Sequence, residues 1–227
     1  RRVDPLRRSQ RVDGASAGRY IELVGSALSD EVETSADLEL LTRFVRAARA
    51  TGDRALDAGC GTGRAGRLLA DHGFDTVGVD IANGMVEIAD REHPDLNFIV
   101  AQLDRLPFAR SRFSTVVCWY SIITTPPDEI IRAFGELHRV LIDGGVILVA
   151  FQAGEGESVK RPNAYGTEVD LTLFRHSIGF IIDALHRSGF DIDSVTERPP
   201  EREHEDSPQA FITATTTPER SCGLNQR

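Results

Sequence analysis

The segment "ALDAGCGTGRAG" (residues 55–66) joins an apolar, strand-like run to a glycine-rich turn. Its glycines are Gly59, Gly61, Gly63 and Gly66. Read from Gly61, "GTGRAG" matches the G-x-G-x-x-G pattern of dinucleotide-binding turns. Read from Asp57, the same letters give an acid followed by G-x-G-x-G, which indicates a different adenosine-containing cofactor. A strand-to-helix turn without a ligand is the third interpretation.

Around this turn, apolar runs alternate with segments of helical period, which is typical of a parallel sheet covered by helices. The expected strands are 54–59, 76–80, 97–102, 114–120, 146–151, 190–197 and 209–216. One expected helix begins near Thr62, and three others span 83–93, 127–141 and 176–188. Gly144 and Gly145 are expected to end the 127–141 helix, and Gly189 follows the last one. No helix separates the last two strands, so we expect them to form an antiparallel hairpin at one sheet edge.

Two segments lie outside this alternation. The stretch "TSADLELLTRFVRAA" (34–48) predicts a helix that starts with a capping box of Thr34 and Asp37. Residues 152–175 have no expected sheet role, and so long a loop usually forms a lid or a pocket wall. We therefore predict three parts: an N-terminal helical lid (1–50) packed on the core, a cofactor-binding domain (51–217) and a tail (218–227). The 152–175 loop is expected to face a second molecule, the one that reacts with the cofactor.

Composition narrows the class of protein. At 227 residues the chain suits one domain, and it has no apolar run long enough to span a bilayer. The net charge is -9 and no basic stripe is present, which disfavours nucleic acid as a partner. The basic N-terminus has no apolar stretch after it, so we expect no secretory signal. The three cysteines are widely spaced, which indicates reduced thiols in a cytoplasmic protein and no zinc site.

Two acids bear on the kind of cofactor, but only Asp57 distinguishes the two classes. Asp80 is expected at the end of the second strand, where a carboxylate can accept both ribose hydroxyls in either class. Asp57 would repel a pyrophosphate but attract an ammonium or sulfonium group. After the third strand, "AQLDRLPF" (101–108) supplies polar groups that could read an adenine edge.

Together these motifs resemble the class I S-adenosylmethionine-dependent methyltransferases, especially the small-molecule branch related to the ubiquinone and menaquinone methylases. "LDAGCGTG" resembles the first motif of the family, "VGVDIANGMVEIA" the second, "AQLDRLPF" the third and "LHRVLIDGGVILVAF" the approach to the fifth strand. The resemblance covers about residues 12–217. It implies S-adenosyl-L-methionine as cofactor, no metal, and a Rossmann-like seven-stranded, mostly parallel sheet with an antiparallel final strand and helices on both faces.

The resemblance also implies a set of cofactor-binding residues. Asp80 corresponds to the ribose acceptor and Met85 to an apolar cover on the adenine, while Gln102 stands where many relatives have an Asp. Tyr20 represents the tyrosine-bearing N-terminal helix that closes over the methionine end. The full set is Tyr20, Asp57, Gly59, Cys60, Gly61, Asp80, Ile81, Met85, Gln102, Leu103 and Trp119.

The acceptor side has no such motif. Methyl transfer from an activated cofactor depends mainly on alignment, so no general base is assigned. The candidates are Tyr120, Ser121, Thr124, Thr125, Tyr165, Asp170, Arg175 and His176. We expect a small, partly apolar organic acceptor and no nucleic acid or membrane partner, with a homodimer contact as another use of the apolar loop residues. The alternatives are a catalytically silent cofactor-binding or scaffold protein and a nicotinamide-dependent oxidoreductase.

Overall fold

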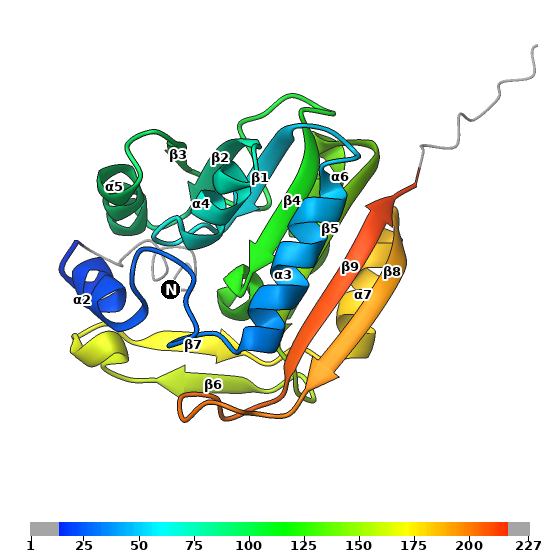
Figure 1. Cartoon of the computed structure of the whole chain (residues 1–227). Helices are drawn as coiled ribbons and strands as arrows, with labels where there is room; N and C mark the ends of the chain where they lie inside the picture. The colour runs from blue at the N-terminus through cyan, green and yellow to red at the C-terminus, as the bar shows by residue number, and fades with distance from the viewer. Residues whose placement is uncertain (1–13, 218–227) are drawn as a thin grey trace, which may run out of the picture.

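The computed structural model describes residues 14–217, and its centre is a seven-stranded sheet in the order β3-β2-β1-β4-β5-β9-β8 (Figure 1). The strands are β1 (Arg54–Ala58), β2 (Asp75–Asp80), β3 (Asn97–Val100), β4 (Phe113–Trp119), β5 (Leu141–Gln152), β8 (Phe190–Arg198) and β9 (Gln209–Thr216). This sheet confirms the predicted α/β, Rossmann-like class. The basic N-terminal residues and the predicted 218–227 tail lie outside the described residues.

Strand directions follow the predicted pattern. β1 pairs in parallel with β2 and β4, β2 with β3, and β4 with β5. β9 is inserted antiparallel between β5 and β8, so the closing hairpin lies at a sheet edge, as expected. All parallel strands therefore end at the same side of the sheet, where ligands of open α/β folds bind.

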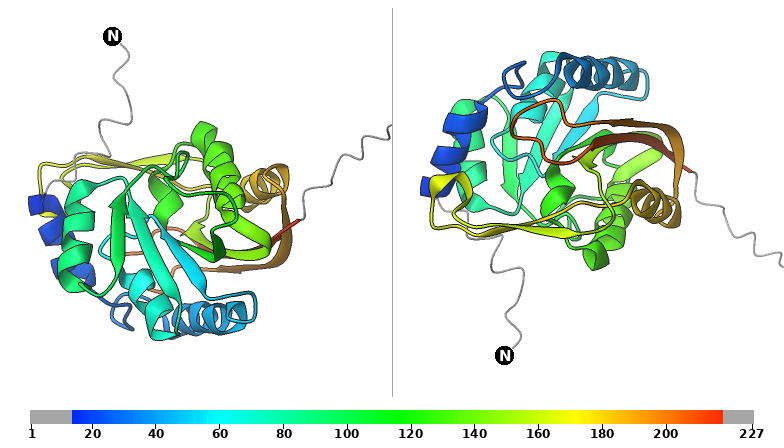
Figure 2. Two further views of the ribbon diagram at one scale, coloured as in Figure 1. Left: turned by 90° about the horizontal axis from the view of Figure 1, so that it is seen from above. Right: turned by 90° about the horizontal axis from the view of Figure 1, so that it is seen from below.

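Helices cover both faces of the sheet (Figure 2). They are α2 (Gly14–Val24), α3 (Ser35–Ala48), α4 (Arg64–Asp71), α5 (Asn83–Glu92), α6 (Pro127–Val140) and α7 (Ile178–Arg187). Buried residues of α3 and α4 share one apolar cluster with the sheet, and those of α6 and α7 share another on the opposite face. α2 packs against α5 instead, beside the carboxyl ends of β2 and β3 (Figure 1).

The start of α3 is fixed by two sets of interactions. The Thr34 hydroxyl accepts a hydrogen bond from the Asp37 N–H at 3.1 Å, and the reciprocal bond completes the predicted capping box. The Asp37 carboxylate is also bound by Arg198 at the end of β8, at 2.5 and 2.9 Å. Arg198 in turn binds Glu205 at 2.6 Å, so a buried ionic cluster joins α3 to the end of the edge strand β8.

Two sequence expectations were wrong. Residues 152–175 are not a plain loop, because β6 (Ser158–Arg161) and β7 (Leu171–Phe174) pair as a separate antiparallel sheet around the short helix η2 (Ala164–Gly166). Gly144 and Gly145 do not end α6. That helix stops at Val140, because Leu141 takes extended dihedrals (φ -78°, ψ 147°) and already begins β5.

Candidate active site

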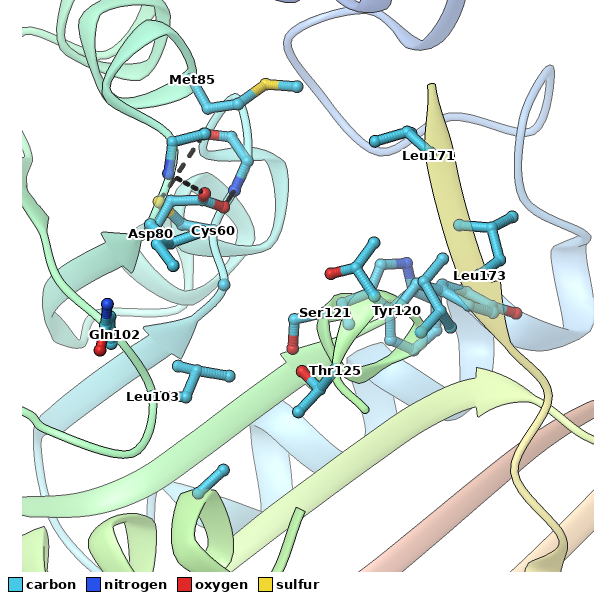
Figure 3. A pocket seen from close by; sticks show the side chains of 18 of the residues that line it. Cys60, Asp80, Met85, Gln102, Leu103, Tyr120, Ser121, Thr125, Leu171 and Leu173 are labelled. Atoms are coloured by element: carbon cyan, nitrogen blue, oxygen red, sulfur yellow. Dashed lines mark hydrogen bonds between the residues drawn. The ribbon is translucent and has the colours of Figure 1, made fainter. Parts of the chain in front are cut away.

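A cleft of about 630 Å³ opens at the carboxyl ends of β1, β2 and β4 (Figure 3). It is bounded by the β1–α4 turn, the loop after β3, the short helix η1 (Ser121–Thr124) and the strand β7. All the residues predicted to bind a cofactor line it: Tyr20, Asp57, Gly59, Cys60, Gly61, Asp80, Ile81, Met85, Gln102, Leu103 and Trp119. The fold therefore brings together residues that span a hundred positions of sequence.

The backbone N–H groups of the glycine turn are used inside the protein. Those of Gly59 and Cys60 both donate to the Val79 carbonyl at 2.8 Å, which ties the turn to β2. The Gly61 N–H donates to Asp80 Oδ2 at 2.9 Å. A dinucleotide turn instead directs its N–H groups at a pyrophosphate, so these bonds disfavour that cofactor class.

Most glycines of the turn are required by packing. A Cβ on Gly59 would lie 2.2 Å from Ser121 Cβ, and one on Gly63 would lie 2.8 Å from the rings of His93 and Phe98. Gly61 differs, because a Cβ there would meet no atom within 4 Å, although its φ of +52° still favours glycine. We expected Gly59 and Gly61 to contact the cofactor, and of these two only Gly61 has open space where a Cβ would lie.

Asp57 occupies the position that an anionic ligand would take. Its side chain is buried at the end of β1, and Oδ2 accepts the Gly66 N–H in the first turn of α4 at 2.7 Å. The helix N-terminus, which binds the pyrophosphate in dinucleotide enzymes, therefore already carries a protein carboxylate. Burial raises the pKa of Asp57 to about 7, although the Gly66 N–H opposes the rise.

Asp80 is held in place without a ligand. Its Oδ1 accepts the Ala82 N–H and its Oδ2 accepts the Gly61 N–H, both at 2.9 Å. Each carboxylate oxygen can accept a further hydrogen bond. The side chain lies at the cleft wall (Figure 3), so it fits the predicted role of accepting two neighbouring hydroxyls.

Apolar side chains form the walls beside Asp80. Met85 is buried on α5, where Tyr20 of α2 packs against the same cluster. Leu103 and Gln102 follow β3 on the other side of the cleft (Figure 3). Adenosine has a flat ring that can lie between apolar walls, a ring edge that can bind the Gln102 amide and a sugar whose hydroxyls can bind the Asp80 carboxylate. The residues present therefore fit an adenosine-containing cofactor.

The other end of the cleft contains five of the eight predicted acceptor residues, namely Tyr120, Ser121, Thr124, Thr125 and Asp170. Leu171 and Leu173 of β7 face them (Figure 3). The hairpin that replaced the expected loop thus supplies an apolar wall of the cleft.

Two further acceptor candidates, His176 and Arg175, do not line the cleft. His176 is buried between the rings of Phe174 and Phe180, with Nε2 3.2 Å from the Ile122 carbonyl oxygen. Burial lowers its pKa, which indicates a neutral structural side chain. Arg175 binds Asp206 at 2.6 Å. The Tyr165 side chain lies outside what the structure describes.

Tyr120 has a strained backbone at the end of β4. Its φ of +57° is uncommon for a residue with a side chain, and such conformations cluster at functional sites. The ring packs edge-on against Trp119 and Phe211, at centroid distances of 5.4 and 6.4 Å. Burial raises the pKa of the Tyr120 hydroxyl, so this group can donate a hydrogen bond but does not act as a base near neutral pH.

Sequence reasoning missed several cleft residues, notably Arg64, Ile123 and Glu129. Arg64 is the charged residue within the "GTGRAG" motif, and its place in a predicted ligand-binding turn was a usable signal. Glu129 lies in the first turn of α6, where acidic residues are common for helix stability, so its sequence context gave no reason to single it out.

Between residues 14 and 217, no group of three or more His, Cys, Asp or Glu side chains is arranged to hold a metal ion. Over the same span, no helix combines the length and the apolar character needed to cross a bilayer. Cys60 and Cys118 are buried free thiols.

Comparison with known proteins gives a consistent result. Residues 55–145 match the methyltransferase domain family. The chain is 37% identical over 99 residues to a demethylmenaquinone methyltransferase of Beutenbergia cavernae, covering 44% of this chain and 40% of that protein. It is 30% identical over 132 residues to a malonyl-[acyl-carrier protein] O-methyltransferase of Pectobacterium atrosepticum, covering 56% and 51%. The chain thus spans about half the length, or less, of these curated relatives.

Among solved structures, the fold matches a magnesium protoporphyrin IX methyltransferase from Synechocystis PCC 6803, determined with bound S-adenosylmethionine. The TM-score is 0.69 at 18% identity, covering 95% of this chain and 98% of that one. At this identity the likeness concerns the fold alone. Residues 55–145 thus match a methyltransferase domain, and the chain has the fold of this S-adenosylmethionine-binding methyltransferase.

Proposed function

We propose that this protein binds S-adenosyl-L-methionine in the cleft and transfers its methyl group to a small organic acceptor. The observation that carries the proposal is the position of Asp57, whose carboxylate occupies the N-terminus of α4 beside the glycine turn. This arrangement disfavours a pyrophosphate and is compatible with a cationic cofactor. It therefore favours a methyltransferase over the nicotinamide-dependent oxidoreductase.

Each predicted residue has a role in this proposal. Asp80 accepts the ribose hydroxyls, and Ile81 and Met85 cover the adenine. Gln102 and Leu103 contact the adenine edge, with the Gln102 carbonyl accepting from its amino group. The remaining contacts, toward the methionine end, come from Tyr20, Asp57, Gly59, Cys60, Gly61 and Trp119.

When bound, the cofactor supplies a methyl group already activated on a sulfonium, so the transfer is an in-line displacement. The chain's own residues then need to hold the acceptor in line and exclude water. The apolar side chains of β7 and the aromatic pair Trp119 and Tyr120 are suited to both tasks. No residue is assigned as a general base, because a base is needed only where the acceptor must lose a proton. Of the candidates, the hydroxyl of Tyr120 stays protonated and His176 lies outside the cleft lining.

The acceptor class is part of the proposal. The cleft has apolar walls with few polar groups, which is the usual character of small-molecule sites. The named relatives are a demethylmenaquinone methyltransferase and a malonyl-[acyl-carrier protein] O-methyltransferase, and both names are consistent with a small organic group as acceptor. A cytoplasmic location, a homodimeric assembly and the lack of a nucleic-acid partner belong to the same proposal.

The test is methyl transfer from labelled S-adenosylmethionine into a pool of small metabolites, followed by identification of the labelled product. Deleting residues 156–172, with a short Gly-Ser bridge, should abolish transfer but spare binding of S-adenosylhomocysteine, because the hairpin lines only the acceptor end. Binding of the cofactor without transfer to any class of molecule would favour the catalytically silent alternative. Methylation of RNA, DNA or folded protein alone would contradict the small-molecule assignment.

A further inference from the structure

The β8–β9 loop (residues 199–208) is fixed by one of its own side chains. The Glu205 carboxylate accepts the backbone N–H groups of Glu201 at 2.8 Å and of Arg202 at 3.1 Å. The same carboxylate binds the Arg198 guanidinium through both of its oxygens, at 2.6 and 2.7 Å. The Glu205 side chain is only 8% exposed. Because charge-assisted hydrogen bonds are stronger than neutral ones, we expect this loop to keep one conformation.

From this loop, Arg202 reaches the turn at residues 29–33, which precedes α3. Its Nη2 donates to the Asp30 carbonyl at 2.7 Å and to the Glu33 carbonyl at 2.5 Å. The Glu33 carboxylate in turn lies 2.8 Å from Arg64 Nη1, and both of these side chains are largely buried. Arg64 begins α4 directly after the glycine turn and lines the cleft. Arg202 is therefore connected through Glu33 to the end of the cleft proposed to hold the cofactor.

Asp206, in the same loop, reaches the β6–β7 hairpin. One of its carboxylate oxygens binds Arg161 at the end of β6, and the other lies 2.6 Å from Arg175 Nη2, just after β7. Figure 1 shows the loop passing below β6. Arg161 pairs with Leu171 across the hairpin, and Leu171 lines the acceptor end of the cleft. Asp206 is therefore connected through the hairpin to the acceptor end.

None of the residues 199–208, all of which the structure describes, lines the cleft itself. We propose that the β8–β9 loop positions two walls of the cleft, with Arg202 holding the 29–33 turn at the cofactor end and Asp206 holding the β6–β7 hairpin at the acceptor end. Both are positioning residues and not catalytic ones, because neither touches the cleft. The inference rests on the proposed function for what fills each end.

Amide hydrogen exchange of the full chain without ligand, measured by mass spectrometry, tests this assignment. Arg202→Met removes two charge-assisted hydrogen bonds, so exchange in residues 29–33 should accelerate at least about tenfold while exchange in β6 and β7 stays unchanged. Asp206→Ala removes two partly exposed ion pairs, so exchange in β6 and β7 should accelerate about threefold while the 29–33 turn stays unchanged. Exchange in the buried strand β4 should not change in either variant, which separates positioning from global stability.

Two further variants serve as controls. Glu203→Gln removes an exposed carboxylate of the same loop that has no hydrogen bond or ion pair with other described residues, so both segments should exchange as in the parent. Asp206→Glu keeps a carboxylate within reach of Arg161 and Arg175, so exchange in β6 and β7 should return to the parent rate.

Saturation with S-adenosylhomocysteine supplies a readout that a merely structural contact would not give. A ligand stabilises only the state that binds it, so at about 100 times its Kd it should slow exchange in the 29–33 turn of Arg202→Met at least about threefold. An unchanged rate there would overturn the link between Arg202 and the cofactor end.

Other outcomes would also overturn the inference. These are faster exchange of both segments in one variant, of neither segment, or of β4, an effect of Glu203→Gln that matches Asp206→Ala, and a failure of Asp206→Glu to restore the hairpin. Failure of the proposed function is recognised separately, because S-adenosylhomocysteine would then not bind the parent protein. Exchange without ligand would still show whether the loop holds the two walls.

Discussion

The buried carboxylate of Asp57 makes stability depend on pH in a direction that a surface carboxylate would not produce. Burial raises its pKa from an ordinary value of 3.8 to about 7. Each tenfold change in an acid constant corresponds to about 1.4 kcal/mol, so ionising Asp57 costs roughly 4 kcal/mol more in the folded protein than in the unfolded chain. Between about pH 4 and pH 7 the unfolded state binds fewer protons, so this residue lowers the free energy of unfolding as pH rises.

The perturbation is Asp57→Asn, which keeps an oxygen to accept the Gly66 N–H but cannot ionise. At pH 4.5 the variant and the parent should have similar free energies of unfolding. As pH rises, the free energy of unfolding of the variant should exceed that of the parent by a growing amount, up to about 4 kcal/mol at pH 8. Urea titration across this range measures the difference directly.

The control is Asp183→Asn, which removes an exposed carboxylate of the Asp183–Arg187 pair. It should change stability by less than about 1 kcal/mol throughout. A difference between Asp57→Asn and the parent that stays constant from pH 4.5 to pH 8, or that favours the parent at pH 8, would refute the reasoning.

Three other predictions concern the turn, the ribose site and the ionic cluster. Gly59→Ala should lower the free energy of unfolding by about 3 kcal/mol, because the new Cβ clashes with Ser121 and the backbone has a positive φ. Gly61→Ala should lower it by only the roughly 1–2 kcal/mol of backbone strain. Equal losses in urea titrations would refute the packing role of Gly59. Asp80→Asn should weaken S-adenosylhomocysteine binding about tenfold or more per folded molecule, while Asp75→Asn on the same strand should not; equal affinities in calorimetry would move the ribose site elsewhere. Arg198→Met should cost about 3–5 kcal/mol because Asp37 and Glu205 lose their buried partner, and a loss below about 1 kcal/mol would show that the cluster is solvated.

Much of the sheet could be predicted because its strands are apolar runs between clear turn signals. β4, for example, is buried at all seven positions from Phe113 to Trp119, and the expected segment 114–120 matches it within one residue. The hairpin of β6 and β7 could not be recognised in the same way. Its strands have four residues each, and "SVKR" is too polar to signal a strand by itself.

The site shows a similar division. Most of the predicted cofactor residues lie at or just after strand ends, so topology alone brings them together, as it does for Asp80 and Gly61. The reason for each glycine was not accessible, because it depends on neighbours far along the chain, such as Ser121 beside Gly59. His176 was singled out by its position at a helix start, but its burial depends on the rings of Phe174 and Phe180 and on packing against η1.

The glycine turn is proposed to bind S-adenosylmethionine and not a dinucleotide. Titration calorimetry of the unmodified protein with S-adenosylhomocysteine and with NAD, under identical conditions, tests it most directly. Saturable, one-to-one binding of S-adenosylhomocysteine, with no measurable heat from NAD, is the predicted result. At about 100 times its Kd, S-adenosylhomocysteine should also stabilise the protein by roughly 2.7 kcal/mol. Binding of NAD without binding of S-adenosylhomocysteine would contradict the claim.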